Sequence, residues 1–138
     1  MKRCVLWYAG LLAVADGTFA EESWLARDGQ AVAQIVMPEA ATPVERTAAQ
    51  ELRDHLEKVT GAAFSLVTEA APKSGPRLLV GNTETSRRLA QDFLAAQAEY
   101  DSILLKTVGD EMILTGHPQR GALYAVYTYL EDVVGVRW

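Results

Sequence analysis

Few residues of this sequence have the type and spacing that acid–base or metal chemistry requires. The two histidines, His55 and His117, lie far apart and match no metal-binding pattern such as H-x-x-x-H, so we interpret both as surface or boundary residues. Carboxylates are numerous, but they fall mainly on the faces and ends of expected helices. The sequence therefore predicts no catalytic residue, no metal ligand and no cofactor.

One junction has the form of an anion-binding turn. The segment Val80-Gly81-Asn82-Thr83 joins an expected strand to an expected helix, and backbone N–H groups at such a junction can bind an anion. Because the segment has a single glycine and lacks the G-x-G-x-x-G and Walker patterns, we interpret it as a turn followed by a helix cap.

Polar and aromatic residues gather near the C-terminus. Arg120, in the segment Gly116–Gly121, begins an expected helix, where positive charge is unfavourable. It can bind the carboxylate of a sugar acid or pair with a carboxylate of the protein, and we favour the protein pairing. Aromatic side chains stack on sugar rings, but at helical spacing they belong more often to a core or an interface. The candidate residues for carbohydrate binding or for an interdomain interface are Arg120, Tyr124, Tyr127, Arg137 and Trp138.

Three helices are expected to position these residues. The first begins with the capping box Thr42-Pro43-Val44-Glu45 and ends at Gly61, and its apolar stripe is Ala48, Leu52, Leu56 and Val59. The second begins at Asn82 or Thr83, and its inner face is Leu89, Ala90, Phe93 and Leu94. The third runs from about Arg120 to Val134 and ends at Gly135.

Strands alternate with these helices along the chain. Two hairpins are expected, across Asp28-Gly29 and across Gly109-Asp110. The expected strands are Trp24–Arg27, Gln30–Met37, Ala63–Thr68, Arg77–Gly81, Ser102–Val108 and Glu111–Thr115. This order predicts a single domain of the α+β class, with a mixed β-sheet, about three helices packed on it and two hairpins.

The first twenty residues have the features of a secretory signal peptide. Lys2 and Arg3 precede an apolar run, Val5–Ala15, that is too short to span a bilayer. Cleavage after Ala15 or after Ala20 fits the small-residue patterns, and we favour Ala20. We therefore expect a signal peptide over residues 1–20, a mature domain over 21–138 and a secreted or periplasmic protein; the alternative is a buried N-terminal element.

Composition restricts the partners. The net charge is −5 and no basic stripe occurs, which argues against nucleic acid as a partner. The sequence has no cationic amphipathic helix that would hold the mature chain on a membrane surface. The only cysteine is Cys4, so a mature chain would have neither disulfides nor thiol ligands.

Several motifs carry a family resemblance. They are Ala48-Ala49-Gln50-Glu51-Leu52, Leu79-Val80-Gly81-Asn82, Arg120-Gly121-Ala122-Leu123-Tyr124-Ala125-Val126-Tyr127 and Gly135-Val136-Arg137-Trp138. With these motifs the chain resembles the N-terminal domain of alpha-glucuronidases and of related bacterial proteins with a glycoside-hydrolase-like region. A similar domain precedes the barrel of beta-hexosaminidases.

The resemblance implies a mixed sheet with helices on one side, followed by a catalytic (β/α)8 barrel expected C-terminal to Trp138. In such enzymes the barrel holds the catalytic carboxylates, and a barrel needs about 250 residues. The smaller domain accounts for all residues of the expected mature chain. The resemblance therefore assigns no catalytic residue to this sequence.

We therefore expect a non-catalytic N-terminal accessory domain of an exported carbohydrate-active enzyme, which docks on the barrel and orients it. Docking predicts an apolar patch near the C-terminus, around Val136 and Trp138. One alternative is a carbohydrate-binding module that presents exposed aromatics, together with Arg120, to a plant or microbial polysaccharide. Another is a small stand-alone hydrolase in which His55 or His117 meets carboxylates.

Overall fold

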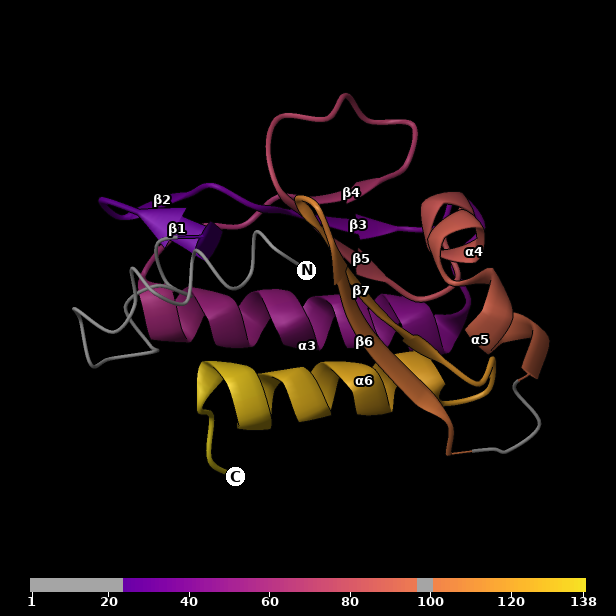
Figure 1. The fold of residues 1–138 in the computed structure, drawn as a ribbon. Helices are drawn as coiled ribbons and strands as arrows, with labels where there is room; N and C mark the ends of the chain where they lie inside the picture. The colour runs from indigo at the N-terminus through magenta and orange to yellow at the C-terminus, as the bar shows by residue number, and fades with distance from the viewer. Residues whose placement is uncertain (1–23, 97–100) are drawn as a thin grey trace, which may run out of the picture.

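Five β-strands form the central sheet, in the order β4-β3-β5-β7-β6. The structure is a computed structural model and describes residues 24–96 and 101–138. The parallel strands are β3 (Gln34–Met37), β4 (Leu66–Thr68), β5 (Arg77–Val80) and β7 (Glu111–Gly116), and β6 (Ile103–Val108) pairs antiparallel with β7. The expected α+β class with a mixed sheet is confirmed (Figure 1).

The first expected hairpin is present but shorter than predicted. It consists of β1 (Ala26–Arg27) and β2 (Gln30–Ala31), which form a separate two-stranded sheet. The N–H groups of Val32 and Ala33 both donate to the carbonyl of Leu25, and this bend ends β2. The predicted strand Gln30–Met37 is therefore divided, because its second half leaves the hairpin to enter the main sheet as β3.

The first long helix, α3 (Pro43–Thr60), follows its local signals. The Thr42 hydroxyl accepts the N–H of Glu45, the Glu45 carboxylate accepts the N–H of Thr42, and Gly61 ends the helix at a φ of 72°. The stripe residues Ala48, Leu52 and Leu56 are fully buried, but Val59 is 49 % exposed. The prediction that Val59 belongs to the buried stripe was therefore wrong: its helical position matches the stripe, but it lies in the last turn of α3, where it stays about half exposed.

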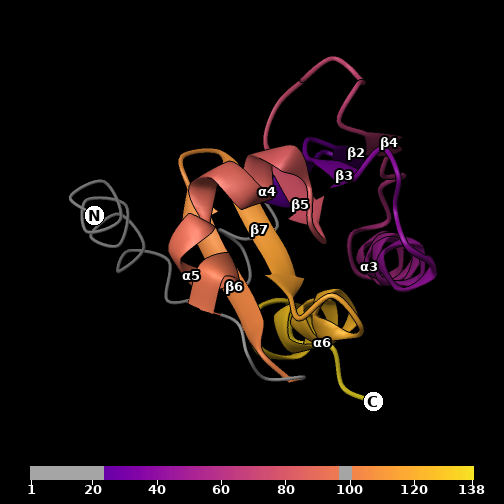
Figure 2. The same ribbon diagram turned by 90° about the vertical axis from the view of Figure 1, so that its right-hand side faces the viewer.

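Helices lie on both faces of the sheet (Figure 2). On one face α3 lies beside α6 (Gly121–Tyr129), which continues as the π-helical turn η1 (Leu130–Val134). On the other face α4 (Glu84–Leu89) and α5 (Gln91–Ala96) contribute Ala90 to a smaller apolar cluster. The family resemblance implied that all helices lie on one side of the sheet, and this is wrong. Alternate strand residues such as Leu79 and Ile113 point to the second face, where α4 and α5 shield them from water.

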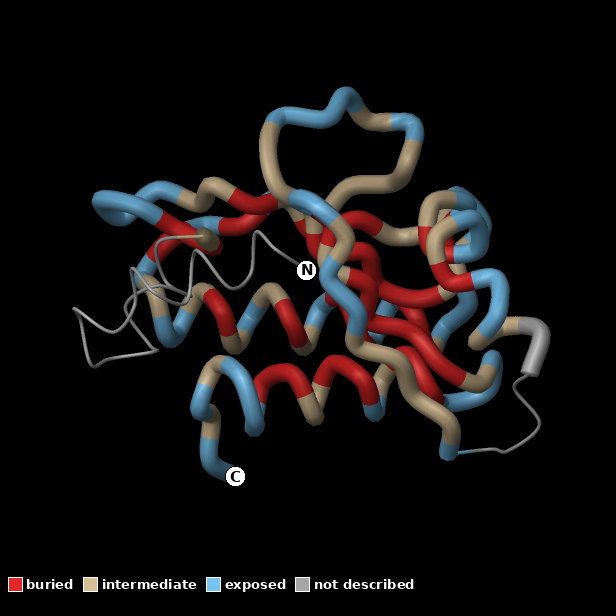
Figure 3. The backbone as a smooth tube through the Cα atoms, in the orientation of Figure 1, coloured by how far each residue is buried: buried red, intermediate tan, exposed pale blue. Residues whose placement is uncertain are grey.

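The core lies mainly between the sheet and the α3–α6 pair (Figure 3). Ile35, Leu78 and Leu114 point to this side and are 0 % exposed, as is Tyr129 of α6. Burial of each such side chain stabilises the fold by roughly 1.5–3 kcal/mol, so this layer contains most of the apolar stabilisation.

Two expected helices are interrupted. The second divides at Ala90, whose φ of −128° is not helical, and of its predicted inner face only Ala90 is buried. The third continues as the π-helical turn η1, in which the N–H of Gly135 donates to the carbonyl of Leu130, five residues earlier. The chain then turns at Gly135, whose φ is 89°. Gly135 is therefore the end of this helix, as predicted.

Within residues 24–96 and 101–138, none of the helices has the length and apolar character that a membrane crossing requires.

A glycine contact joins β7 to α6. A Cβ atom on Gly121 would lie 2.3 Å from the carbonyl carbon of Gly116, and a Cβ on Gly116 would lie 2.2 Å from the carbonyl oxygen of Ser102. Because these neighbours are backbone atoms, they have little freedom to move aside. The segment 116–121 can therefore place the start of α6 against the sheet only with glycine at both ends.

We expect Gly121→Ala to lower the free energy of unfolding by about 3 kcal/mol, because the added methyl group overlaps backbone. Gly29→Ala is the control: Gly29 has a φ of +73° but open space around it, so it should lose only about 1 kcal/mol from backbone strain. Urea unfolding of both variants measures the difference. Equal losses of unfolding free energy in the two variants would show that the approach of Gly121 to the backbone of Gly116 is not tight.

Candidate functional site

An aromatic cluster joins α3, α6 and the C-terminal tail. The ring of Trp138 meets Tyr127 edge to face at a centroid distance of 5.1 Å and meets His55 at 4.9 Å. Trp138 is nevertheless 65 % exposed. We call His55, Tyr127 and Trp138 the C-terminal aromatic cluster.

Neighbouring groups hold this cluster in place. Nδ1 of His55 lies 2.9 Å from the backbone carbonyl of Glu51 and 3.6 Å from its carboxylate. Burial, and secondarily the charge of Glu51, raises the pKa of the Tyr127 hydroxyl, so Tyr127 stays protonated and neutral. The tail is tied back by the N–H of Val136, which donates to the Leu130 carbonyl over 2.8 Å.

The five candidate residues do not form a single site. Tyr127 and Trp138 meet in the aromatic cluster, whereas Arg120 donates to the Tyr124 hydroxyl over 3.3 Å at the start of α6. Arg137 donates to the carbonyl of Glu131 over 3.2 Å and so serves the end of η1. His55 belongs to the cluster although the sequence gave no sign of it, because its partner Trp138 is distant along the chain.

Exposed apolar residues lie on the same elements. Among residues 24–96 and 101–138, the large hydrophobic side chains with high exposure are Val59, Tyr124, Val133 and Trp138. They belong to the last turn of α3, to α6, to η1 and to the tail. We call this surface, together with the aromatic cluster, the C-terminal face.

A separate cleft of about 500 Å³ lies where the parallel strands end. It is lined by residues that follow β3, β4 and β5 and by the end of β7, among them Pro38, Glu69, Asn82 and Gly116. After β3 the chain continues into α3 on one face, and after β5 it continues into α4 on the other. Clefts at such divergence points are the usual ligand sites of open α/β sheets.

Glu45 lies in the wall of this cleft and is only 8 % exposed. One carboxylate oxygen accepts the N–H of Thr42 and the other accepts the N–H of Asn82, each over 2.8 Å. Gly81 permits this approach, because a Cβ there would lie 2.6 Å from the Glu45 carboxylate and its φ is +85°. The carboxylate therefore fastens the start of α3 to the turn after β5. The sequence indicated the capping box but not this second bond.

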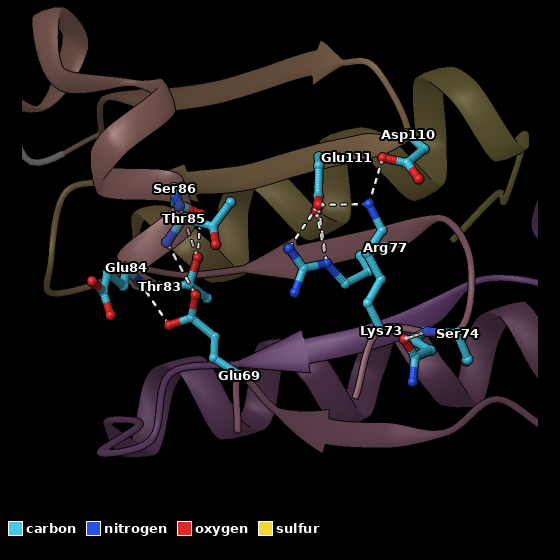
Figure 4. A network of polar contacts seen from close by, with 11 residues as sticks. Glu69, Lys73, Ser74, Arg77, Thr83, Glu84, Thr85, Ser86, Asp110 and Glu111 are labelled. Atoms are coloured by element: carbon cyan, nitrogen blue, oxygen red, sulfur yellow. Dashed lines mark hydrogen bonds and ion pairs between the residues drawn. The ribbon is translucent and has the colours of Figure 1, made fainter. Parts of the chain in front are cut away.

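Two more glutamates of the cleft bind backbone N–H groups. Glu69 accepts the N–H of Glu84 over 2.7 Å and that of Thr85 over 3.0 Å, and it thereby caps α4 (Figure 4). Glu39 accepts the N–H of Ala70 over 2.7 Å.

All three carboxylates have a structural role, because each accepts backbone N–H groups. Hydrogen bonds from the Thr68 hydroxyl and, secondarily, from the Ala70 N–H lower the pKa of the Glu39 carboxyl. A general acid needs the opposite shift, because it must hold a proton near neutral pH. His117 lines the same cleft, as the hydrolase alternative expected. Its Nδ1 is already engaged within the protein, because it accepts the N–H of Gln119 over 3.3 Å.

A third polar group lies at the opposite ends of the strands. Arg77 binds the Glu111 carboxylate over 2.6 Å, and Lys73 bridges Glu111 at 3.2 Å and Asp110 at 2.7 Å (Figure 4). The ammonium of Lys73 holds the pKa of Asp110 below its usual value. These ion pairs fix the loop before β5 against β7.

In the described part of the chain, no three histidine, cysteine or acidic residues are arranged to hold a metal ion.

A family model for the N-terminus of glycosyl hydrolase family 67 matches residues 21–129. The matched range includes every strand and ends with the last residue of α6, so it contains Arg120, Tyr124 and Tyr127 but not Arg137 or Trp138. No curated protein matches the chain.

We expect Glu45→Ala to lower the free energy of unfolding by about 3 kcal/mol, because two N–H groups at the ends of elements lose their acceptor. Glu45→Gln should lose less, about 1–2 kcal/mol, since the amide keeps one acceptor oxygen. Glu84→Gln, an exposed glutamate of the same cleft, is the control and should change stability by less than about 0.5 kcal/mol. Chemical denaturation gives all three values. A loss for Glu45→Ala as small as that of the control would show that the two bonds are unimportant.

Proposed function

The chain belongs to the family of glycosyl hydrolase family 67 N-terminal domains, and from this premise we propose that it is the non-catalytic accessory domain of an exported alpha-glucuronidase-type enzyme. The match over residues 21–129 is the observation that carries the proposal. The structural roles of Glu39, Glu45 and Glu69 support it, because these carboxylates bind the protein's own backbone.

The proposed task is to dock on a catalytic (β/α)8 barrel that follows Trp138 and to fix its orientation. The C-terminal face supports this role. Trp138 leaves 65 % of its surface exposed, and tryptophan is enriched among the residues that anchor protein interfaces. Val59, Tyr124 and Val133 add exposed apolar surface on α3, α6 and η1, and apolar surface of this kind suits an interaction site when it is contiguous.

The tail is suited to docking because it is already ordered. Its hydrogen bonds from Val136 to Leu130 and from Arg137 to Glu131, together with the ring contacts of Trp138, hold it on the α3–α6 pair. A preordered anchor loses less conformational entropy on binding than a mobile one. The barrel would therefore meet a rigid surface, and its orientation would be set by the helices rather than by a flexible linker.

Export is the second part of the proposal. The signal peptide proposed for residues 1–20 lies outside the described residues. The family match begins at residue 21, the first residue after the favoured cleavage site, which supports a mature domain over 21–138. We propose that the protein is secreted or periplasmic and that the whole enzyme acts on plant or microbial polysaccharide.

Docking predicts a single cooperative unfolding transition for a polypeptide in which this domain is joined to its barrel. Trp138→Ala should separate the transition of this domain from that of the barrel, because the anchor of the interface is lost. Arg88→Ala, on α4 at the other face of the sheet, should leave the two transitions merged. Differential scanning calorimetry measures this, and two independent transitions in the unaltered protein would refute docking.

Export predicts that the mature protein recovered from the periplasm or medium begins at Glu21. Intact-mass spectrometry identifies this N-terminus, and Ala20→Gln should block processing because a large polar side chain replaces the small one at the cleavage site. Recovery from the cytoplasm of a chain that retains residues 1–20 would show that these residues are not a signal peptide.

A further inference from the structure

We propose that the cleft at the ends of β3, β5 and β7 binds a small neutral ligand rich in hydroxyl groups, of the size of a sugar ring. Its volume of about 500 Å³ lies within the range of roughly 300–1,000 Å³ that small-molecule sites occupy. The site is distinct from the C-terminal face and does not depend on docking.

The cleft offers far more hydrogen-bond acceptors than donors. Glu39, Glu45, Glu69 and Glu84 all line it. Each carboxylate has about four lone-pair positions, and the backbone contacts described above occupy two of them on Glu45 and two on Glu69. A ligand that donates hydrogen bonds is therefore favoured, and an anion such as a uronate or a phosphate is repelled.

One acceptor of the cleft lacks a protein partner altogether. The side-chain oxygen of Asn82 is buried, and no donor of the described residues reaches it. A buried polar atom without a partner is uncommon and calls for a water or a ligand. Asn82 lies directly after β5, at the point where the chain diverges to opposite faces of the sheet, so its unsatisfied oxygen and the topology indicate the same place.

The remaining walls supply a charged hydrogen-bond donor and apolar surface. Arg87 lines the cleft, and among the described residues no carboxylate forms an ion pair with it. Its charge offsets part of the negative charge of the glutamates, and its guanidinium N–H groups can donate to a hydroxyl oxygen. Apolar walls come from Pro38, Ala40, Pro118 and Ala122, which suit the C–H surface of a sugar ring.

Titration of the 138-residue chain with xylose and with glucose, followed by amide NMR, tests the proposal. We expect the signals of Asn82, Gly116 and His117 to move with a dissociation constant in the millimolar range. Glucuronate should bind at least about tenfold more weakly, because the glutamates repel its carboxylate. Spermidine tests the cationic alternative and should leave these signals in place.

Variants of adjacent residues separate the cleft from the general surface. Asn82→Ala and Arg87→Ala should each weaken sugar binding by about three- to tenfold, the effect of one lost hydrogen bond. Arg88→Ala is the matched control, because Arg88 follows Arg87 on α4 but lines a different depression. Circular dichroism and the melting temperature show whether each variant is folded.

Four results would overturn the proposal: no sugar-induced shift in the cleft, stronger binding of spermidine than of sugar, shifts confined to the C-terminal aromatic cluster, or equal effects of Arg87→Ala and Arg88→Ala. None of these results bears on the accessory role, which is tested by the calorimetry of the joined protein. Conversely, independent unfolding of the two domains would leave the cleft proposal intact.

Discussion

The buried carboxylate of Glu45 fixes the geometry on which the rest of the molecule depends. A charge that is 8 % exposed is stable only when hydrogen bonds replace its water, and here the N–H groups of Thr42 and Asn82 do so. These donors belong to the start of α3 and to the turn after β5, so one side chain sets the helix against the sheet. From that fixed end α3 extends 18 residues, about 27 Å, and carries His55 to Trp138. The same helix thus positions both the cleft and the C-terminal face.

Glutamates take the place of missing backbone acceptors throughout the cleft. Glu69 receives the first N–H groups of α4, Glu45 receives those of Thr42 before α3 and Asn82 after β5, and Glu39 receives that of Ala70 after β4. For Glu39, hydrogen bonds from Thr68 and Ala70 lower the pKa of the carboxyl group, which favours its charged form and makes it a poor proton donor. A catalytic carboxyl pair needs one member whose pKa is raised. The hydrogen bonds that lower the pKa of Glu39 thus act against its use as a general acid.

Local signals predicted most of the fold, and non-local contacts explain what they missed. The capping box at Thr42 and Glu45, the glycine ends at Gly61 and Gly135 and the hairpin across Gly109-Asp110 depend on a few adjacent residues, and all are present. The bond from Asn82 to Glu45 joins residues 37 apart, and the contact of His55 with Trp138 spans still more of the chain. Periodicity also could not show that Val59 stays about half exposed, or that α4 and α5 lie on the second face of the sheet. For the same reason the candidate residues were identified one by one, but their division among three places was not.

The two proposed surfaces place different demands on the fold. An interface anchor has to be exposed yet immobile, and Trp138 achieves this by resting its edge contacts on His55 and Tyr127 while its remaining surface faces outward. A ligand cleft has to keep polar groups in place without satisfying all of them, which the backbone bonds of Glu45 and Glu69 and the unpaired oxygen of Asn82 achieve. Because Glu45 lies in the first turn of α3 and His55 about 15 Å further along it, a domain seated on Trp138 need not cover the cleft. The two proposals are therefore compatible, because one surface would orient a neighbour while the other binds a small ligand.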